Sequence, residues 1–378
     1  MSEKLLADFL ERYKSFTIIP DTSLDSLLCG GVIFKKLIEH GFDVKLSLDS
    51  KILIDYPDDP ALTIGLPSVN SNKQLALLPG EDDNSSLTGL LVLKLDKLVG
   101  VDKWDKLSAI IAGLYKGLYD FKAGGFKGVE NSFLKDLIND KVVVDVAGLR
   151  LWGSKRLNLA TALYRTLMPF IPGVTGNIDK SMKIVSEVFK TTDPLNIRQK
   201  ELRVDEAKDS ILLFLKTLTE QARDPQLAFK LLGDFYINLS DLGVSGEIEA
   251  NELMGSLVVL ASLCRDCPFY VSLLSMEKSI ILQAVAIYDE VIDDLSRYLS
   301  SQIDKAKRGE AVEGGDLIKR PDIIIDVLRY INALPKDKAV KLTSDRGPLT
   351  VLRELIRIGV KPEEAYSSCE DDQICPTK

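Results

Sequence analysis

Phe16-Thr17-Ile18-Ile19, followed by Pro20-Asp21-Thr22-Ser23-Leu24-Asp25-Ser26, is the stretch that decides the fold class of this chain. The apolar run fits a buried strand, and the polar loop after it leads into a helix whose apolar stripe is Leu28, Val32, Ile33 and Leu37. We expect this helix to end at His40-Gly41, because glycine commonly stops a helix. A strand that leads through a short loop into a helix is the first half of a crossover unit, which predicts an α/β fold.

The same alternation continues to about residue 180. It predicts a mainly parallel sheet covered by helices on both faces, and we assign residues 1–180 to this α/β domain. The further strand candidates are 44–48, 51–54, 61–64 and 74–78, and the further helix candidates are 85–99 and 106–118.

After residue 180 the pattern changes to a helical middle segment, 181–308, and then to a small α/β domain, 309–378. The middle segment contains one long amphipathic stripe: Ile281, Val285, Tyr288, Ile292, Leu295, Leu299 and Ile303. We expect a flexible connector at 308–316, and then a helix at 323–331, a strand at 339–343 and a helix at 349–358. Residues 363–378 are polar, and we expect them to be frayed.

Composition excludes several classes of protein. The chain has 378 residues, 46% of them hydrophobic, with a net charge of −8, which argues against a protein that coats duplex nucleic acid. His40 is the only histidine, so mechanisms that need two imidazoles are unavailable. The absence of an uncharged apolar run of roughly 18 residues and of a signal-peptide core predicts a soluble, cytoplasmic protein with no membrane association.

The polar loop is the first candidate site. Asp21 and Asp25 follow a strand of a predicted parallel sheet, where ligands commonly bind, and their carboxylates could hold a divalent metal. Asp21, Ser23 or Asp25 could equally accept hydrogen bonds from the free N–H groups of the following helix. The residue types favour this capping interpretation.

The cysteines form a second candidate group. Cys264 and Cys267 have the spacing of a zinc or redox pair, but they follow an apolar helical run and have no matched second pair, since Cys369 and Cys375 are spaced differently. We therefore expect them to pack as small apolar side chains. The odd total of five cysteines favours a reducing compartment.

Basic residues form a third group, and some of them lie among aromatic residues. Such strips can follow single-stranded nucleic acid, with rings stacking on bases, although solvated loop lysines explain the same pattern. The candidates are Tyr115, Lys116, Lys122, Lys127, Arg150, Lys155 and Arg156.

Several motifs resemble the DHH phosphoesterases. The segment Ser23 to Gly30 resembles their first motif, H-x-D-x-D, and is similar to the D-x-D-A-L-C form of the superfamily member in the CMG replicative helicase. Gly148 to Gly153 and Pro169 to Gly176 resemble the G-L-R-x-F-G and P-Y-I-P-G-I-S-G segments of archaeal RecJ-like nucleases. Weaker similarities to these nucleases occur at Ala250 to Arg265 and Val340 to Arg346.

The resemblance implies two manganese ions in the active members, but the matching positions here depart from the pattern. Asp21 stands at the first-motif histidine and Ser23 at its first aspartate, and only Asp25 keeps its type. Gly65-Leu66-Pro67 stands where the second-motif aspartate belongs, and Leu78-Pro79-Gly80 where D-H-H belongs. Lys116 falls at a metal-ligand position, and no Gly-rich loop ending in histidine follows residue 358.

Two close divalent cations need several anionic or imidazole ligands, which these positions do not supply. The resemblance therefore implies a catalytically inactive RecJ-like protein without cofactor or metal, acting as a scaffold of a replicative helicase. By the same resemblance its partners would be GINS, MCM through GINS, and single-stranded DNA, in the nucleoid region of an archaeal cytoplasm. The alternative is a manganese-dependent single-strand nuclease or phosphoesterase with an atypical site around Asp21 and Asp25.

Overall fold

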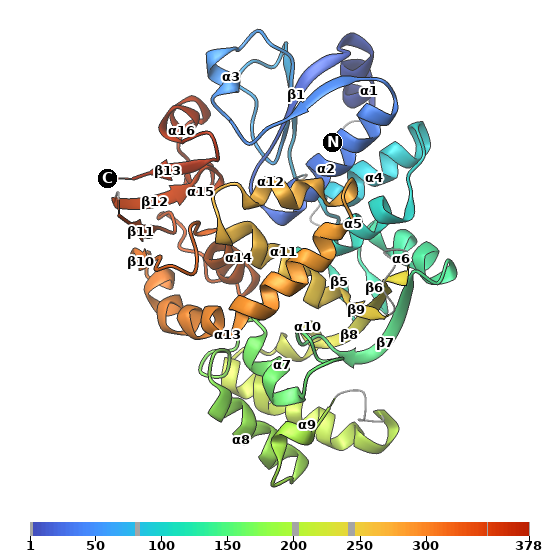
Figure 1. Cartoon of the computed structure of the whole chain (residues 1–378), viewed down its shortest axis with the longest axis vertical. Coiled ribbons are helices and arrows are strands. Elements are labelled where there is room, and N and C mark those ends of the chain that lie inside the picture. Colours follow the sequence, from blue (N-terminus) through green and yellow to red (C-terminus); the bar gives the residue numbers. More distant parts are fainter. Residues whose placement is uncertain (1–2, 80–83, 199–203, 241–245, 346, 378) are drawn as a thin grey trace.

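The computed structural model describes residues 3–79, 84–198, 204–240, 246–345 and 347–377 (Figure 1). Its first part contains a four-stranded sheet in the order β2-β1-β3-β4, in which every pair of neighbours is parallel. The predicted α/β fold with a parallel sheet is therefore confirmed. The elements are α1 (Glu3–Arg12), β1 (Ser15–Pro20), α2 (Leu24–Glu39), β2 (Asp43–Leu46), α3 (Ile52–Asp55), β3 (Ala61–Ile64), β4 (Gln74–Leu77), α4 (Leu87–Leu98) and α5 (Lys103–Tyr115). The segment 51–54, predicted as a strand, lies mostly in helix α3, because its apolar residues cover the sheet rather than pair within it.

Helix α2 is the central element of this part. Ser23 begins it by accepting a hydrogen bond from the N–H of Ser26, and His40 with Gly41 ends it as predicted. Most of its side chains are buried, because it lies between the sheet and a layer that includes α4, α5 and the later helix α12 (Cys267–Ser272). At Gly31, α2 approaches α12 so closely that a Cβ atom would lie 1.7 Å from the carbonyl oxygen of Ser272.

The middle of the chain is mainly helical, but it contains a three-stranded antiparallel sheet, β7-β8-β9. None of these three strands was predicted from the sequence, because β7 and β8 pair across about 90 residues and local patterns do not reveal such a partner. Helices α7, α8 and α9 lie together at one end of the molecule (Figure 1). A separate apolar core joins them. The elements are β5 (Tyr119–Asp120), β6 (Gly125–Phe126), α6 (Glu130–Asn139), β7 (Val143–Leu149), α7 (Leu159–Arg165), α8 (Ile178–Phe189), η1 (Pro194–Asn196), α9 (Val204–Ala222), α10 (Leu227–Lys230), β8 (Leu232–Asn238) and β9 (Glu247–Glu249).

Two helices in the second half of the chain, α11 and α13, contribute many residues to the main apolar core. Helix α11 (Ala250–Leu263) is buried along nearly its whole length, and α12 and η4 (Leu273–Ser275) connect it to α13 (Ser279–Lys307). The predicted stripe on α13 is confirmed: Val285 is partly buried and its other members are buried. No helix in the described ranges, α13 included, combines the length and apolar character that a membrane span requires.

The chain closes with a second four-stranded sheet, in the order β10-β11-β12-β13. The expected connector at 308–316 contains β10, which pairs with β11, and the expected fraying of 363–378 is wrong. Tyr366 of α16 is fully buried, and β13 pairs with β12, because the tail supplies apolar residues to a core with α3. The elements are β10 (Val312–Glu313), α14 (Asp322–Tyr330), β11 (Leu342–Ser344), β12 (Gly347–Val351), α15 (Leu352–Arg357), α16 (Pro362–Ser368) and β13 (Ile374–Pro376).

Four of the five cysteines form disulfides, which corrects the expectation of apolar packing and argues against the reducing compartment that the odd number of cysteines favoured. Cys264 pairs with Cys267 and Cys369 with Cys375, while Cys29 is free and buried. Each pair closes a short turn, so its sulfur atoms meet without any long-range arrangement. The main core extends from Leu6 to Val351, and the division of the chain at residues 180 and 308 stays a prediction.

Candidate functional site at the carboxyl ends of the parallel strands

The loop after β1 places Asp21, Ser23 and Asp25 at the carboxyl end of the sheet, all of them buried. Asp21 accepts a hydrogen bond from the N–H of Ser23 at 2.7 Å. The carboxylate of Asp25 accepts from the N–H groups of Leu87 and Thr88, each at 2.9 Å. The carboxylate of Asp25 therefore accepts hydrogen bonds from the free N–H groups at the N-terminus of α4. This is a capping role, but the capped helix is distant in sequence rather than the one that follows the loop.

Gly65, at the end of β3, approaches Asp21 directly. Its φ is +74°, and a Cβ atom there would lie 2.3 Å from Oδ2 of Asp21. A side chain at this position, such as the second-motif aspartate, would therefore displace Asp21. Burial raises the pKa of the Asp21 carboxyl, although Arg353 opposes the shift.

The other degenerate positions contribute no carboxylate or imidazole. Leu78 and Pro79, after β4, are exposed, and Gly80 lies outside the described residues. Lys116 is the C-terminal cap residue of α5 and is half-buried. The ends of β3 and β4 therefore add no metal ligand to the loop after β1 within the described part of the chain.

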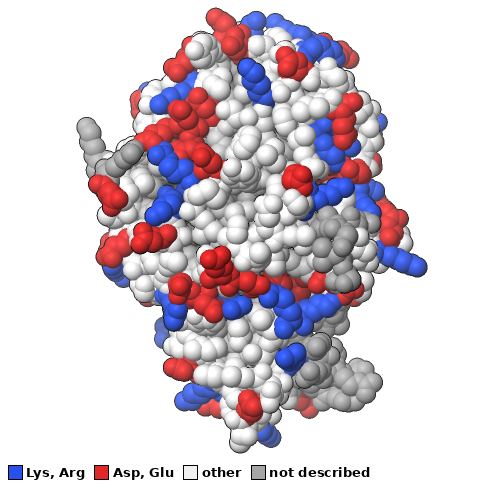
Figure 2. All heavy atoms as spheres, in the orientation of Figure 1, with Lys and Arg blue, Asp and Glu red and all other residues white. Residues whose placement is uncertain are grey.

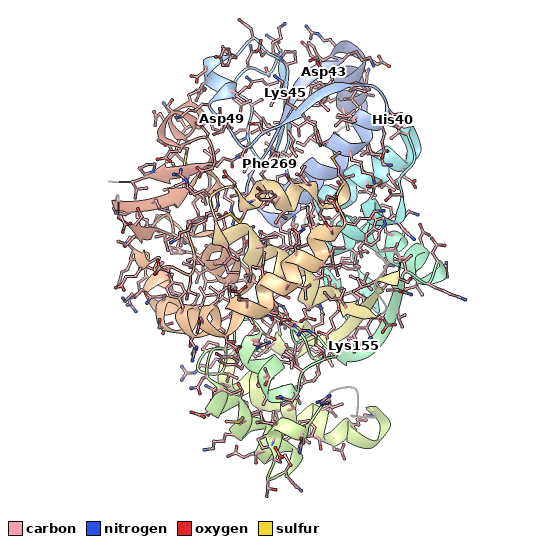
Figure 3. All side chains as sticks on the ribbon, viewed as in Figure 1. His40, Asp43, Lys45, Asp49, Lys155 and Phe269 are labelled. Carbon is pink, nitrogen blue, oxygen red and sulfur yellow. A yellow bond between two sulfur atoms is a disulfide. The ribbon has the colours of Figure 1, made fainter. Side chains whose placement is uncertain are left out.

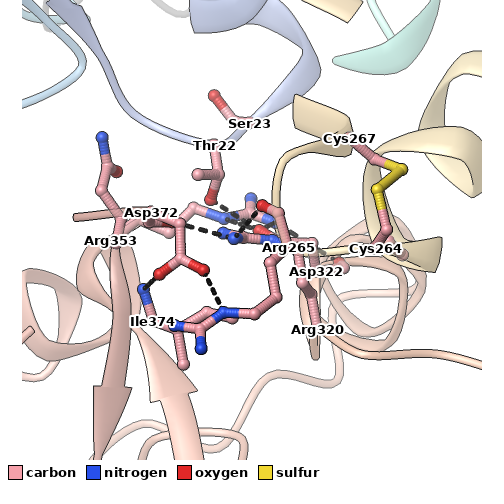
Figure 4. Close-up of polar contacts among 12 residues, drawn as sticks. Thr22, Ser23, Cys264, Arg265, Cys267, Arg320, Asp322, Arg353, Asp372 and Ile374 are labelled. Carbon is pink, nitrogen blue, oxygen red and sulfur yellow. Dashed lines mark hydrogen bonds and ion pairs between the residues drawn. A yellow bond between two sulfur atoms is a disulfide. The ribbon is translucent and has the colours of Figure 1, made fainter. Parts of the chain in front are cut away.

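Beside this loop lies a set of charged and hydroxyl-bearing side chains that we call the buried ion network, and Figure 4 shows its part around Asp322 and Arg353. It joins the loop after β1 to α5, α14 and α15. Its members are Thr22, Tyr115, Arg320, Asp322, Asp326 and Arg353.

Arg353 is the centre of the network. Its Nη2 lies 3.0 Å from Oδ1 of Asp322, and its Nη1 lies 2.8 Å from Oδ1 of Asp326. The hydroxyl of Thr22 donates to Asp322 at 2.6 Å, and that of Tyr115 donates to Asp326 at 2.6 Å. Arg320, which is fully buried, donates through Nε to Asp322 at 2.8 Å. Arg329, which is partly exposed, adds a third guanidinium 3.7 Å from Asp326. Each buried carboxylate of the network therefore has at least one arginine partner, which is the condition for burying ions.

The pKa values follow from these contacts. Burial alone would raise the pKa of Asp322, but Arg320 and Arg353 outweigh it and hold the pKa below its ordinary value. Burial opposes the charge of Arg353, yet Asp326, Tyr115 and Asp322 raise its pKa well above the ordinary value. Burial also raises the pKa of Tyr115. Asp322 and Arg353 therefore stay ionised as partners near neutral pH.

These residues do not fit a pair of manganese ions. In the described ranges, no three His, Cys, Asp or Glu side chains converge in a way that could hold a metal. The carboxylate of Asp25 is engaged by backbone N–H groups, and those of Asp322 and Asp326 by arginines. The arrangement can lock the loop after β1 onto the C-terminal sheet domain, but it leaves no anionic ligand set for a metal-activated hydroxide.

Of the candidate nucleic-acid-binding residues, Lys122 and Arg150 meet at Phe229, where Lys122 faces the ring and Arg150 donates to the carbonyl oxygen at 3.1 Å. The ring of Tyr115 is buried, so it has no free face for stacking on a base. Lys122 and Lys127 are exposed, and the ammonium of Lys122 lies 3.8 Å from the centre of the Phe229 ring. Lys127 therefore fits the interpretation of a solvated loop lysine, whereas Lys122 makes a cation–π contact with Phe229.

The second basic cluster is occupied by contacts within the chain. Arg150 is buried, and its Nε donates to the carbonyl of Leu232 at 3.0 Å. Lys155, labelled in Figure 3, pairs with Glu247, and Arg156 donates to Glu252 at 2.8 Å. Acidic partners thus offset the charges of Lys155 and Arg156.

Sequence reasoning missed the acidic half of the buried ion network. Asp322 and Asp326 are one turn apart on α14, and the residues between them are the apolar run Ile323-Ile324-Ile325. Two carboxylates on such an apolar helix are expected to be buried, and buried carboxylates need cationic partners. The sequence therefore held a signal for this half of the network. The arginine partner, Arg353, could not be read from the sequence because it lies about 30 residues further along, after a hairpin.

These elements define an α/β fold built on a parallel sheet, with a mainly helical middle segment and a second sheet at the C-terminal end. A solved structure with the same arrangement is CDC45 from Entamoeba histolytica, with a TM-score of 0.60 and 11% sequence identity over 90% of this chain and 84% of that chain. The chain thus shares the fold of this CDC45 structure. No family model matches the sequence, and no curated relative matches it.

Proposed function

We propose that this protein is a catalytically inactive scaffold subunit of an archaeal-type replicative helicase assembly. In this proposal it binds GINS, reaches the MCM motor through GINS, and contacts single-stranded DNA. It requires no metal or cofactor, and it acts in the cytoplasm at the nucleoid.

The observation that carries the proposal is the buried ion network in a fold of the CDC45 type. At the edge of the sheet where a RecJ-like nuclease would need metal ligands, the carboxylates here are occupied by Arg320, Arg353 and the N-terminus of α4. A framework that retains its architecture but engages its carboxylates in internal contacts supports a binding role over hydrolysis.

The distribution of surface charge supports binding to protein partners rather than autonomous binding to DNA. The net charge is −8, and Figure 2 shows acidic and basic side chains interspersed over the face in view rather than one basic stripe. Autonomous DNA binding needs a concentrated excess of lysine and arginine. Docking between protein partners suits this surface better.

Catalytic inactivity is tested by incubating the purified protein with end-labelled single-stranded DNA and Mn²⁺. We expect no release of nucleotides. Asp21→Asn and Asp25→Asn serve as controls for contamination, because trace nuclease activity would survive both substitutions. Release that both variants abolish, with circular dichroism unchanged, would establish the alternative phosphoesterase.

Partner binding is tested by gel filtration of the full chain with an archaeal GINS complex at moderate salt. We expect a co-eluting peak that also retains MCM when MCM is added. GINS and this protein run separately provide the reference volumes. Separate elution of the two, with the protein still folded, would contradict the scaffold role.

Contact with single-stranded DNA is assigned to the exposed Lys122 and Lys127, next to the partly exposed Phe121. We expect Lys122→Glu together with Lys127→Glu to weaken oligonucleotide binding and to reduce its salt dependence. Lys183→Glu and Lys216→Glu, which are exposed on α8 and α9, form the matched control. Equal loss in both double variants would show that the contact lies elsewhere.

A further inference from the structure

A groove of about 840 Å³ lies between the end of β2, helix α12 and the turn before β13. Asp49 and Phe269, labelled in Figure 3, line it from different elements. Figure 2 shows an uncharged area in the middle of this face, with acidic side chains gathered beside it. The volume is within the range of specific binding sites, so the groove is large enough for a short chain segment.

The charged residues that line the groove are mostly acidic and come from the loop after β2, the N-terminus of α12 and the turn before β13. Asp49, Asp266, Glu370, Asp371 and Asp372 line the groove, against Lys51 and Arg265 as the basic lining residues. Both basic groups already have partners within this set: Arg265 pairs with Glu370 and Asp372, and Lys51 lies 4.0 Å from Asp371. Five carboxylates against two basic groups leave negative charge in excess here. Burial raises the pKa of Asp49, and the charges of Asp371 and Asp55 add to the shift while Lys51 opposes it.

The outer face of α12 adds aromatic surface to the groove. Cys267 and Val271 are buried against the main core, whereas the side chain of Tyr270 is 55% exposed and Phe269 is half-buried at the groove. These two rings offer aromatic surface beside the acidic residues. Aromatic faces next to carboxylates are suited to guanidinium and ammonium groups, which bind both.

The walls of the groove are held in place before any partner binds. Cys264–Cys267 fixes the turn that carries Arg265 and Asp266, and Cys369–Cys375 closes the turn that carries the acidic residues 370–372. Arg320 joins the two turns by donating to the carbonyl oxygens of Arg265 and Asp372, at 3.1 and 2.8 Å. A preformed site lowers the entropy cost of binding.

We propose that this groove, which we call the acidic groove, docks an extended segment of a partner protein in which arginine or lysine alternates with apolar residues. Successive side chains of an extended segment point to opposite sides. One set then faces the carboxylates, and the other set faces Phe269 and Tyr270. This inference does not depend on the helicase role, because it follows from the groove alone.

The test uses the full chain and a short fluorescein-labelled peptide that alternates arginine with leucine, followed by fluorescence anisotropy. The same peptide with glutamate in place of arginine is the negative probe. Asp266→Lys together with Asp371→Lys reverses two exposed charges of the acidic groove and should weaken binding by at least about tenfold. Tyr270→Ala should weaken it by about threefold, and Tyr270→Phe should restore it.

Glu187→Lys together with Glu220→Lys is the matched control, because it makes the same change of net charge on exposed positions of α8 and α9. This control should bind the arginine peptide as the unmodified protein does. Equal loss in both double variants would reduce the effect to overall charge and overturn the proposal. Absence of binding, or equal binding of the glutamate peptide, would also overturn it, whatever the outcome of the GINS experiment.

Discussion

Arg353 brings a positive charge into the interior beside Asp322 and Asp326. We predict that Arg353→Met lowers the free energy of unfolding by about 3–5 kcal/mol, because it leaves two buried carboxylates with one fewer cation. Urea denaturation measures the change. Arg297→Met, which breaks an exposed ion pair on α13, should have no measurable effect.

A second pair of substitutions separates lost charge from lost packing. Asp326→Asn, combined with Arg353→Met, should recover part of the lost stability, because Asp322 keeps Arg320 as its partner and no carboxylate of the network is then left without a cation. If Arg353→Met alone were as stable as the unmodified protein, the buried ion network would have no structural role.

Asp21 gives a prediction with a defined pH dependence. Its pKa in the folded protein is raised above the ordinary 3.8, so between these two values the folded state binds more protons than the unfolded state. The contribution of Asp21 to stability therefore falls as the pH rises from 3.8 through the folded pKa. Asp21→Asn should become increasingly stabilising over this interval and then level off, measured as the difference in unfolding free energy from the unmodified protein. A difference that stays constant with pH would contradict the raised pKa.

At the scale of elements, the two disulfides fix the turns around α12 and β13. Thiol titration of the denatured, unreduced protein should detect one thiol per chain, Cys29, and reduction should raise the number to five. Detection of five thiols without reductant would show that the bridges are absent.

Removing one disulfide should lower the free energy of unfolding by a measurable amount. Cys369→Ser with Cys375→Ser should lower the free energy of unfolding by about 2 kcal/mol, since the bridge closes only a short loop. It should also increase hydrogen exchange in α16 and β13. Cys29→Ser, which breaks no bridge, should leave exchange there unchanged.

The elements that were predictable share strong local signals. The strand, loop and helix at 16–40 and the stripe of α13 follow from periodicity and end signals, which act within a few turns. Strands β8 and β9 were missed, and the tail was read as frayed, because their stability comes from distant partners: β7 and the core around α3.

The candidate site, too, could be predicted from the sequence only in part. Position and polarity indicated that Asp21, Ser23 and Asp25 lie at the end of the first strand, and the structure places them there. The hydrogen bonds from the N-terminus of α4 to Asp25 could not be predicted from the sequence, since the two partners lie 62 residues apart. The burial of Tyr115 likewise depends on Asp326, far along the chain.

At the scale of the whole molecule, the parallel sheet and the C-terminal sheet domain are joined through charged and polar contacts. The buried ion network links Thr22 to α14 and α15, and Gln373 donates to the carbonyl oxygens of Pro20 and Leu48. The junction between the two sheets is thus filled by the protein's own side chains.

The most direct test of this account is a crystal grown with Mn²⁺ and measured for anomalous scattering at the manganese edge. We predict no manganese peak between Asp21, Asp25 and Asp322, with the guanidinium of Arg353 seated between Asp322 and Asp326. Two peaks liganded from the loop after β1, with Arg353 displaced, would contradict it.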